Sequence, residues 1–518
     1  MLFRSLAAVL LAIGLAVGGG GAWLVALGGS PYYLLGGVAV ALSGFWLWRF
    51  NARAGWLYAG FLLLTALWAL WEVGLDGWQL TARIVGPAVF GLLFALPPVR
   101  NRIGPSGWAA AGAALAGLLV VFGTSMQSPM EVAAGKTPEQ RPVKTSGNDN
   151  EWAAWGRDNA GTRFSPLTQI TAANVGKLKL AWEYDTGYDP MTDAAPSPLQ
   201  STPIMMDGRL FLCTQTNVVV ALDPDTGQEL WRYDPKVDPT GGTAVRTCRG
   251  VAHYVSASGA AATDPATAPL CARRIITSTF NAKLVALDSA TGKLCPTFGQ
   301  DGIVDLKEGM GEVLPGYYFV SSAPTITRGT IVIGGWVADN LSANQPSGVI
   351  RGFDAETGKL RWAWDAGDPA NSKGAPAGKW YTRSTPNSWA PMSADEDLGL
   401  VYVPTGNPAP DYFGGYRTPA SDKFGSSVLA LDVETGALRW SFQTAHHDLW
   451  DYDVASQPTL FDFAGKSGPV PALAQATKRG ELFVLDRRTG KPLTEVTDRK
   501  STRLNSSHIQ KSRMPSSA

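Results

Sequence analysis

The segment from His446 to Asp453 concentrates side chains that can do chemistry. It reads His-His-Asp-Leu-Trp-Asp-Tyr-Asp, so eight residues hold three carboxylates, one tryptophan and two of the chain's four histidines. The segment follows a strand-like run, Leu438 to Thr444, and precedes a loop with Pro458. This much charge and aromatic surface in one loop favours a binding site. The alternative is a solvated turn between two strands.

The composition excludes several kinds of site and partner. The 518 residues carry a net charge of +1, so nothing indicates a nucleic-acid partner. The four histidines and four cysteines have no spacing typical of a zinc site. No glycine-rich dinucleotide fingerprint follows a strand in residues 151–497, which argues against NAD.

The elements that must position the loop are repeated along the chain. The pattern Asp-x-x-Thr-Gly follows a hydrophobic pair five times, with its aspartates at Asp223, Asp288, Asp354, Asp432 and Asp486. Each copy predicts two strands joined by a tight turn, because aspartate bonds to turn N–H groups and glycine permits a positive φ. In three copies a tryptophan follows on the second strand, where it can pack between neighbouring units. A degenerate first copy ends at Trp182.

Repeats of this size predict an all-β propeller. The aspartates are 54 to 78 residues apart, which leaves room for about four strands in each unit. A β-solenoid is the alternative, but its repeats are much shorter. Residues 150–497 hold five or six such units.

Residues 1–125 form a different block that is almost uncharged. Apolar runs occur at about 6–27, 33–48, 55–75, 81–97 and 108–123. Each is close to the length of a membrane-spanning helix, although the second and the last two are short. The loops on the opposite side from the arginines include Glu72 and Asp76, which we expect to be solvated; contact with a lipid quinone is the alternative.

The arginines of this block predict its orientation. They lie before the first run, between the second and third, and between the fourth and fifth: Arg4, Arg49, Arg53, Arg100 and Arg102. The positive-inside rule therefore places the N-terminus in the cytoplasm. Five spans then place everything after Ser125 on the far side of the membrane, which is the periplasm in a Gram-negative cell.

The composition divides the chain into four parts. They are a membrane domain with five transmembrane helices at 1–125, a linker at 126–150, a propeller at 151–497 and a tail at 498–518. The linker is rich in Pro, Gly, Ser, Thr and charge. The tail has no strand period and few apolar residues, which predicts non-native or disordered sequence.

The repeat Asp-x-x-Thr-Gly-x-x-x-Trp resembles the tryptophan motif of the pyrroloquinoline quinone (PQQ) dehydrogenases. Five apolar runs followed by such a propeller resemble the membrane-bound glucose dehydrogenases of the glucose, quinate and shikimate group, from residue 1 to about 497. The resemblance implies an eight-bladed quinoprotein β-propeller, of which this chain holds about five to six blades. A chain that lacks the remaining blades is expected to be inactive.

The resemblance also implies an activity. The expected reaction is the periplasmic oxidation of an aldose, glucose to gluconolactone, by PQQ, with electrons passing to ubiquinone in the lipid of the inner membrane. A quinate or shikimate dehydrogenase, acting on a cyclic polyol, is one alternative. A non-catalytic propeller scaffold is another, but it would not need Trp389, Asp451 and Lys478 together.

The resemblance assigns roles around the cofactor. Asp451, in Leu-Trp-Asp, matches the catalytic base; the alternative is a turn cap. Lys478, in Ala-Thr-Lys-Arg-Gly, matches the residue that contacts the quinone oxygens. Trp389, in Asn-Ser-Trp-Ala-Pro, matches the tryptophan on which PQQ stacks, with packing between blades as the alternative. Arg249, in Cys-Arg-Gly-Val, matches a partner of a PQQ carboxylate. Gln200 lies where soluble relatives place a glutamate beside the cofactor.

The resemblance further assigns a divalent cation. Asp339 and Asn340, in Trp-Val-Ala-Asp-Asn, match the cation-binding pair, and Asn407, in Thr-Gly-Asn-Pro, resembles the asparagine ligand of soluble alcohol-oxidising relatives. Oxygen ligands of this kind suit Ca²⁺ and Mg²⁺ equally.

The histidines bear on the substrate. His446 and His447 are expected to orient Asp451 or to contact the sugar. His253 lies close to the family's substrate-pocket histidine but is shifted by one residue, which leaves the preference for glucose open.

All four cysteines lie beyond residue 200, in the exported part. An oxidising compartment permits two disulfides with three possible connectivities, and four free thiols are the alternative. The pairing of Cys248 with Cys271 is favoured, because it would close a long Ala- and Thr-rich insert at about 255–269.

Overall fold

The computed structural model describes residues 2–26, 29–74, 77–92, 94, 96–127, 150–189, 197–237, 247–262, 267–465 and 468–494. The predicted tail and nearly all of the predicted linker lie outside these residues. The chain forms two compact units, which contain the described residues up to Gln127 and those from Asn150 onward.

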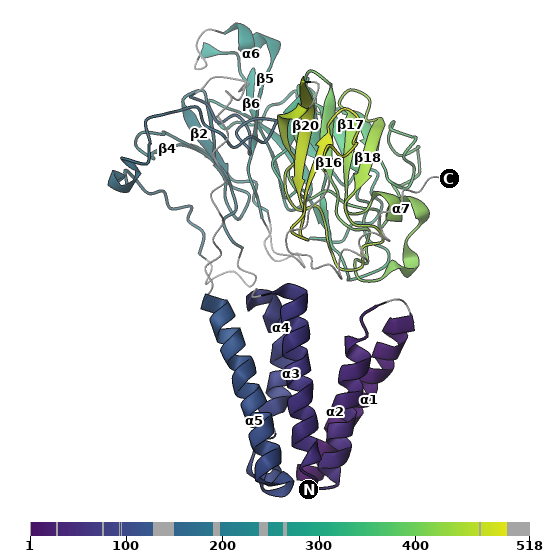
Figure 1. Cartoon of the computed structure of the whole chain (residues 1–518). Coiled ribbons are helices and arrows are strands. Elements are labelled where there is room, and N and C mark those ends of the chain that lie inside the picture. Colours follow the sequence, from purple (N-terminus) through teal and green to yellow (C-terminus); the bar gives the residue numbers. More distant parts are fainter. Residues whose placement is uncertain are drawn as a thin grey trace. The chain divides into compact units, whose positions relative to one another are not determined.

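The first unit is helical (Figure 1). Its helices are α1 (Leu2–Ala26), α2 (Tyr32–Trp48), α3 (Arg53–Val73), α4 (Gly77–Leu92) and α5 (Pro97–Gln127). Three stretches are long and apolar enough to cross a membrane, namely Ala7–Ala26, Arg53–Val73 and Ile103–Val120. The apolar stretches Tyr32–Trp48 and Arg83–Leu92 are shorter. The presence of membrane-spanning helices is therefore supported, while their number stays a prediction.

The surface of this unit is apolar. Trp23 is 71 % exposed and Trp71 is 68 % exposed, which is unfavourable in water and suits lipid. Glu72 is instead 8 % exposed, and its Oε2 accepts a hydrogen bond from Nε of Arg83 at 2.6 Å. The prediction of a solvated loop charge at Glu72 was wrong, because α3 extends past this residue and α4 brings Arg83 beside it. Asp76 lies outside the described residues.

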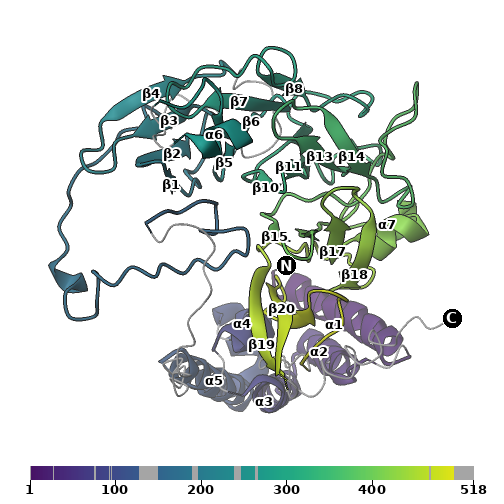
Figure 2. The same ribbon diagram turned by 90° about the horizontal axis from the view of Figure 1, so that it is seen from above.

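The second unit consists of antiparallel sheets that follow one another around an arc (Figure 2). The strands of the first two sheets are β1 (Ile204–Met206), β2 (Arg209–Cys213), β3 (Val219–Leu222) and β4 (Glu229–Tyr233), and β5 (Ala252–Val255), β6 (Arg273–Ser278), β7 (Lys283–Asp288) and β8 (Ile303–Asp305). The third has β10 (Thr325–Thr327), β11 (Thr330–Ile333), β13 (Ile350–Asp354) and β14 (Leu360–Trp364), next to the pair β9 (Tyr318–Phe319) and β12 (Trp336–Val337).

Two further sheets complete the described part of the arc. They are β15 (Ser393–Asp395), β16 (Leu400–Pro404), β17 (Ser427–Asp432) and β18 (Leu438–Gln443), and the three-stranded β19 (Thr459–Gly465), β20 (Gly468–Ala476) and β21 (Leu482–Asp486). The sheets are up-and-down meanders, and β1, β5, β10 and β15 lie on the inner side of the arc (Figure 2). This is the arrangement of propeller blades.

The repeated turns form as the sequence predicts. Oδ1 of Asp432 accepts hydrogen bonds from Thr435 N and Thr435 Oγ1, both at 2.9 Å, and Gly436 has a φ of 71°. The same bonds occur at Asp223, Asp288 and Asp354. The turn at Asp486 differs, because its carboxylate binds the side chain and N–H of Arg488.

The motif tryptophans join neighbouring blades, as predicted. Nε1 of Trp362 donates to Val433 O at 2.7 Å, and its ring lies where a Cβ on Gly436 would have to fit. Trp182, Trp231 and Trp440 repeat this contact one blade apart. Four of the turn glycines are thus needed twice, for their positive φ and for the tryptophan ring that lies on them: Gly227, Gly292, Gly436 and Gly490.

The disulfides differ from the prediction. The structure pairs Cys213 with Cys248 and Cys271 with Cys295, so the pairing of Cys248 with Cys271 was wrong. The insert is closed without a disulfide, by the short helix α6 (Ala257–Ala261) and by a hydrogen bond from Ser256 N to Ala272 O at 2.9 Å. The bond from Cys213, at the end of β2, to Cys248 joins the first two blades just before Arg249.

An axial segment, residues 152–161, connects the inner strands. Trp152 pairs with Met205 of β1, and Nδ2 of Asn159 donates to Ile326 O of β10 at 2.8 Å. The carbonyl oxygens of Asn159 and Ala160 accept from Ala394 N of β15 and Leu460 N of β19, both at 2.8 Å. One stretch of ten residues therefore holds together four sheets, those that contain β1, β10, β15 and β19.

The residues that follow the axial segment are unlike the blades. Residues 163–181 contain no strand, only the short 3₁₀ helix Val175–Lys177, and they run apart from the sheets until Trp182 reaches the first blade (Figure 2). Ile170 is 62 % exposed and Leu180 is 81 % exposed. This segment presents an apolar strip that the described residues do not cover.

Candidate active site

The predicted cofactor residues lie where segments of the chain enter the inner strands. Gln200, Arg249 and Trp389 precede β1, β5 and β15 respectively. Asp451 lies in the loop before β19, and Lys478 lies in the turn between β20 and β21. Because inner strands converge on the axis, residues far apart in sequence can meet there.

Asp453 connects three of the predicted site segments. Its Oδ2 accepts a hydrogen bond from Nε1 of Trp389 at 2.9 Å and lies 3.5 Å from Nζ of Lys478. Its Oδ1 accepts from the backbone N of Asn407 at 2.7 Å. Asp453 is 7 % exposed, and burial raises its pKa to about 6 although Lys478 opposes the shift. Asp453 is not among the predicted site residues.

Lys478 and Asp451 are in direct contact. Nζ of Lys478 donates to Oδ1 of Asp451 at 3.0 Å and to its backbone oxygen at 2.9 Å. Burial lowers the pKa of Lys478, but the carboxylates of Asp453 and Asp451 outweigh burial, so the net shift is upward. The lysine is therefore a fixed positive charge beside Asp451, whose backbone has a φ of 59°.

Two cations lie over the indole of Trp389. Cζ of Arg249 is 5.3 Å and Nζ of Lys478 is 5.9 Å from the ring centroid. Nη1 of Arg249 donates to Oγ of Ser321 at 2.7 Å, and Ser321 and Ser322 both donate to the carbonyl of Trp389. Burial lowers the pKa of Arg249, and no carboxylate among the described residues pairs with it.

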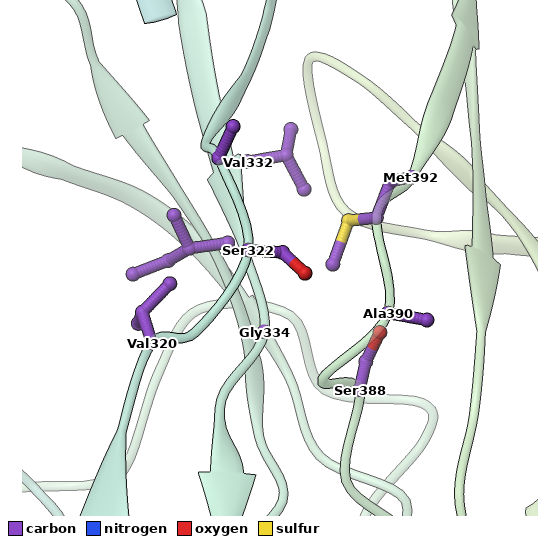
Figure 3. Close-up of a pocket in the computed structure, with 9 residues that line it drawn as sticks. Val320, Ser322, Val332, Gly334, Ser388, Ala390 and Met392 are labelled. Carbon is purple, nitrogen blue, oxygen red and sulfur yellow. The ribbon is translucent and has the colours of Figure 1, made fainter. Parts of the chain in front are cut away.

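A cavity lined by Ser388 and Ala390, the neighbours of Trp389, is not the cofactor site. It has room for about one water molecule, so a tricyclic cofactor does not fit. Figure 3 shows its walls on either side, with Val320, Ser322, Val332 and Gly334 facing Ser388, Ala390 and Met392.

An aromatic face beneath two cations fits a planar polyanion such as PQQ, which carries three carboxylates. Arg249 is the residue that best supports the fit. It is half-buried and lacks an anionic partner in the described part of the chain, so a carboxylate of the cofactor could pair with it. Gln200 is less constrained. It is exposed, and its Oε1 accepts a hydrogen bond from Oγ1 of Thr247, two residues before Arg249.

The predicted cation pair meets a further carboxylate, Asp411. Oδ1 of Asn340 accepts from Asp411 N at 2.9 Å, and Nδ2 of Asn340 donates to Oδ2 of Asp411 at 3.2 Å. Burial and the carboxylates of Asp339, Asp453 and Asp451 raise the pKa of Asp411 to about 8. Burial also raises the pKa of Asp339, although its hydrogen bond with Asp411 opposes the shift.

Asp339, Asp411, Asp451 and Asp453 thus form one electrostatic group, whose oxygen donors suit a hard cation. Asp411 could not be found from sequence, because its contact with Asn340 spans 71 residues. The described part of the chain contains no preassembled cluster of three or more His, Cys, Asp or Glu side chains with the geometry of a metal site.

Asn407 is separate from the cation pair. It is 4 % exposed, and its Nδ2 donates to Oδ2 of Asp448 at 2.9 Å. Oγ of Ser426 lies 3.1 Å from its Oδ1. No hydrogen bond among the described residues joins Asn407 to Asp339 or Asn340, and its side chain is instead bonded to Asp448 in the segment 446–453.

In the described part of the chain, no hydrogen bond or ion pair joins a histidine to Asp451. His446 is exposed, and Nδ1 of His447 lies 3.1 Å from Oδ1 of Asp422. The side chain of His253 is 3 % exposed, and its Nε2 lies 3.0 Å from Oδ2 of Asp207. Within the described residues, none of the three histidines contacts Asp451.

Blades that repeat a turn aspartate and an inter-blade tryptophan, with an indole, two cations and several carboxylates at their inner ends, define the quinoprotein dehydrogenase class of β-propellers. The chain belongs to the PQQ family described as "Glucose/ethanol/alcohol dehydrogenase, beta-propeller domain", which matches residues 152–512. The predicted propeller and the resemblance to PQQ dehydrogenases are thereby confirmed.

Several characterised proteins are similar. Quinoprotein glucose dehydrogenase A of Acinetobacter calcoaceticus is 40 % identical over 496 residues, which are 93 % of this chain and 62 % of the relative. Quinate/shikimate dehydrogenase (quinone) of Acinetobacter baylyi is 39 % identical over 498 residues, 92 % of this chain and 61 % of the relative. The chain thus spans about three fifths of the length of these relatives.

A solved structure is similar as well. The quinohemoprotein alcohol dehydrogenase from Comamonas testosteroni superimposes with a TM-score of 0.53 and is 29 % identical. The match covers 68 % of this chain and 51 % of that chain. It supports the propeller fold of the second unit.

Proposed function

We propose that this protein is a membrane-anchored, PQQ-dependent dehydrogenase that oxidises an aldose, glucose to gluconolactone, in the periplasm. The observation that carries the proposal is the meeting of Trp389, Asp451, Lys478 and Arg249 at the inner ends of separate blades. A non-catalytic scaffold has no use for such a group. The similarity to glucose dehydrogenase A supports the choice of substrate class.

The chain's own residues have distinct parts in this proposal. PQQ, when bound, supplies a quinone that accepts a hydride from the alcohol carbon. Trp389 offers the flat face for it, Arg249 pairs with a carboxylate, Gln200 donates a hydrogen bond, and Lys478 stabilises negative charge on the quinone oxygens.

Asp451 is the proposed base. Its carboxylate removes the hydroxyl proton of the sugar, and the hydrogen bond from Lys478 Nζ to its Oδ1 at 3.0 Å fixes the orientation of that carboxylate. Asp339 and Asn340 are the proposed ligands of Ca²⁺ or Mg²⁺, and Asp411 contacts both. Asn407 is the third proposed ligand, and its Nδ2 is held by Asp448.

The proposed organisation follows the composition of the chain. A five-helix membrane domain at 1–125 anchors the protein in the lipid of the inner membrane, with a cytoplasmic N-terminus, and passes electrons to ubiquinone. A linker at 126–150 leads to the propeller at 151–497, and 498–518 is proposed to be a tail, although the family match extends to residue 512. Because the relatives are longer, we infer that further residues complete the ring. The chain continued to the length of those relatives is called the full-length parent below.

A quinate or shikimate dehydrogenase is the second candidate. The observation that favours it is the position of His253, which faces Asp207 and is unavailable to a sugar. The relative that acts on quinate and shikimate is as similar as the glucose dehydrogenase, at 39 % against 40 % identity.

A dye-reduction assay tests the proposal and separates the candidates. The full-length parent is reconstituted with PQQ and either Mg²⁺ or Ca²⁺ and assayed with glucose, quinate and shikimate. Reduction with glucose supports the first candidate, and reduction with quinate or shikimate alone supports the second. No PQQ-dependent reduction with any of the three would contradict both.

A further inference from the structure

Asp448 is a buried acceptor three residues before Asp451. It is 4 % exposed, and four hydrogen bonds end on its two carboxylate oxygens. Oδ2 accepts from Asn407 Nδ2 at 2.9 Å, from Ser426 Oγ at 2.7 Å and from Tyr452 N at 2.6 Å. Oδ1 accepts from Trp450 N at 2.9 Å.

The two backbone donors lie on either side of Asp451. Trp450 N and Tyr452 N belong to the residues that flank it. The Tyr452 N–H lies in the peptide plane directly after the Asp451 α-carbon, and the Trp450 N–H fixes the peptide plane between residues 449 and 450. Asp451 has a φ of 59°, in the left-handed region that residues with a Cβ rarely occupy. Such a conformation persists only where surrounding contacts hold it.

The two side-chain donors connect the loop to the blade. Asn407 follows β16 and Ser426 precedes β17, so both are attached to central strands of the sheet. Asn407 also donates its backbone N–H to Asp453 at 2.7 Å. The loop is therefore fixed to one sheet on both sides of Asp451, through Asp448 before it and Asp453 after it.

We propose that Asp448 is the positioning residue of Asp451. Its carboxylate holds the backbone of residues 450–452 so that the Asp451 side chain is directed at Lys478 and the face of Trp389. A carboxylate is required, because an amide has a single acceptor oxygen and its NH₂ group would oppose the donors. The inference rests on the proposed role of Asp451 as base.

The test compares Asp448→Asn with Asp432→Asn in the full-length parent. Asp432 is the matched control, because it also accepts four hydrogen bonds, in a turn of the same sheet. Each variant is reconstituted with PQQ and Mg²⁺. The measurements are kcat and KM for the substrate that the wild-type parent oxidises, PQQ affinity by quenching of tryptophan fluorescence, and amide hydrogen exchange in the peptide 446–453.

Asp448→Asn is expected to lower kcat about 10- to 100-fold with KM and PQQ affinity nearly unchanged, since small misplacements of a reacting group have effects of this size. Exchange in the peptide 446–453 becomes faster. Asp432→Asn leaves kcat and this exchange unchanged. Ser426→Ala removes one donor and serves as a milder second variant, with a smaller loss of kcat in the same direction.

Three outcomes would overturn the inference. Equal losses of kcat in the Asp448 and Asp432 variants indicate general destabilisation. Unchanged exchange in the Asp448 variant means that the loop does not depend on this carboxylate. A parallel loss of PQQ affinity assigns Asp448 to cofactor binding. If the wild-type parent oxidises none of the three substrates, the proposed function fails, while the exchange measurements still decide whether Asp448 holds the loop.

Discussion

At the level of single residues, Asp453 sets the orientation of the site. It binds the edge of the Trp389 indole and the N–H of Asn407, and it shares Lys478 with Asp451. A buried carboxylate is stable only when its partners remain in place. The direction of the aromatic face and the position of the lysine are therefore determined together.

Asp451→Asn is expected to retain PQQ binding and to lose turnover by about 10²- to 10⁴-fold, the contribution of a general base. Lys478 stays nearby, because it also donates to the backbone oxygen of residue 451 at 2.9 Å. The measurement is kcat for the reconstituted full-length parent, together with PQQ titration. Near-normal turnover in this variant would remove Asp451 from the mechanism.

Asp411 makes the stability of the metal-free protein depend on pH. Its pKa is raised to about 8, whereas an aspartate in an unfolded chain titrates near 4. Between about pH 4 and 8 the folded chain retains a proton that the unfolded chain releases, so stability falls as pH rises through this window. Asp411→Asn has no such proton and is expected to raise Tm by about 2–5 °C at pH 8 and hardly at pH 4.

The measurement is thermal unfolding at pH 4, 6 and 8 in EDTA. Asp432→Asn is the control with the opposite sign. Burial raises the pKa of Asp432, but hydrogen bonds from Arg439 and Thr435 outweigh it, so the net shift is downward. Its stabilising effect is present above about pH 4, and the variant should lose Tm at pH 8. A pH-independent gain for Asp411→Asn would contradict the assigned shift.

Some residues of the candidate site could be predicted from sequence motifs, and others could not. Trp389, Asp451 and Lys478 stand in short recognisable motifs, and the structure brings them together. Asp411 stands in no such motif, and its role depends on Asn340, which lies 71 residues away. Asp453 is only two residues from Asp451, and the Trp-Asp-Tyr-Asp spacing was the available signal for it.

At the level of elements, the sequence predicts the turns, which form within a few residues. It does not predict the disulfides, which join residues that are distant in the chain. An Asp-x-x-Thr-Gly turn closes within six residues, so the sequence predicts it, and the tryptophan follows at a fixed distance. The disulfides depend on which strand ends lie side by side. Cys213 lies at the end of β2 and meets a segment that enters the next blade, and nothing in the cysteine spacing reveals this neighbour.

The helical elements carry a prediction of their own. A reporter fused after residue 130 should be active only in the periplasm, and one fused near Arg53 only in the cytoplasm, because five spans place these positions on opposite sides. Alkaline phosphatase and β-galactosidase fusions provide the paired measurement. Since α2 and α4 have the shorter apolar stretches, a cytoplasmic signal at 130 would mean that one of them does not cross.

At the level of the whole molecule, the ring is the expected unit of activity. The described sheets form an arc, and the segment 163–181 exposes apolar residues such as Leu180. Open strand edges and apolar faces of this kind are covered when a propeller closes. We therefore expect the 518-residue chain to be inactive even with PQQ and metal supplied, because an unclosed ring would leave its site open to water.

Side-by-side expression of the 518-residue chain and the full-length parent checks this expectation. Both are reconstituted and assayed with the same substrate and dye. A rate for the short chain of about a tenth of the parent's or more would show that the local group suffices without a closed ring.

The axial segment has a consequence for the order of folding. Its contacts reach from Gly161 to Thr459, 298 residues later in the chain. At synthesis rates of about 5–20 residues per second, residue 459 emerges roughly 15–60 s after residue 161. The axial segment is therefore synthesised before all of the blades, but it can complete its contacts only after the blade that contains Thr459 has been synthesised. Contacts this distant in sequence slow folding, so the early blades must remain soluble and unaggregated while the chain waits for its own later part.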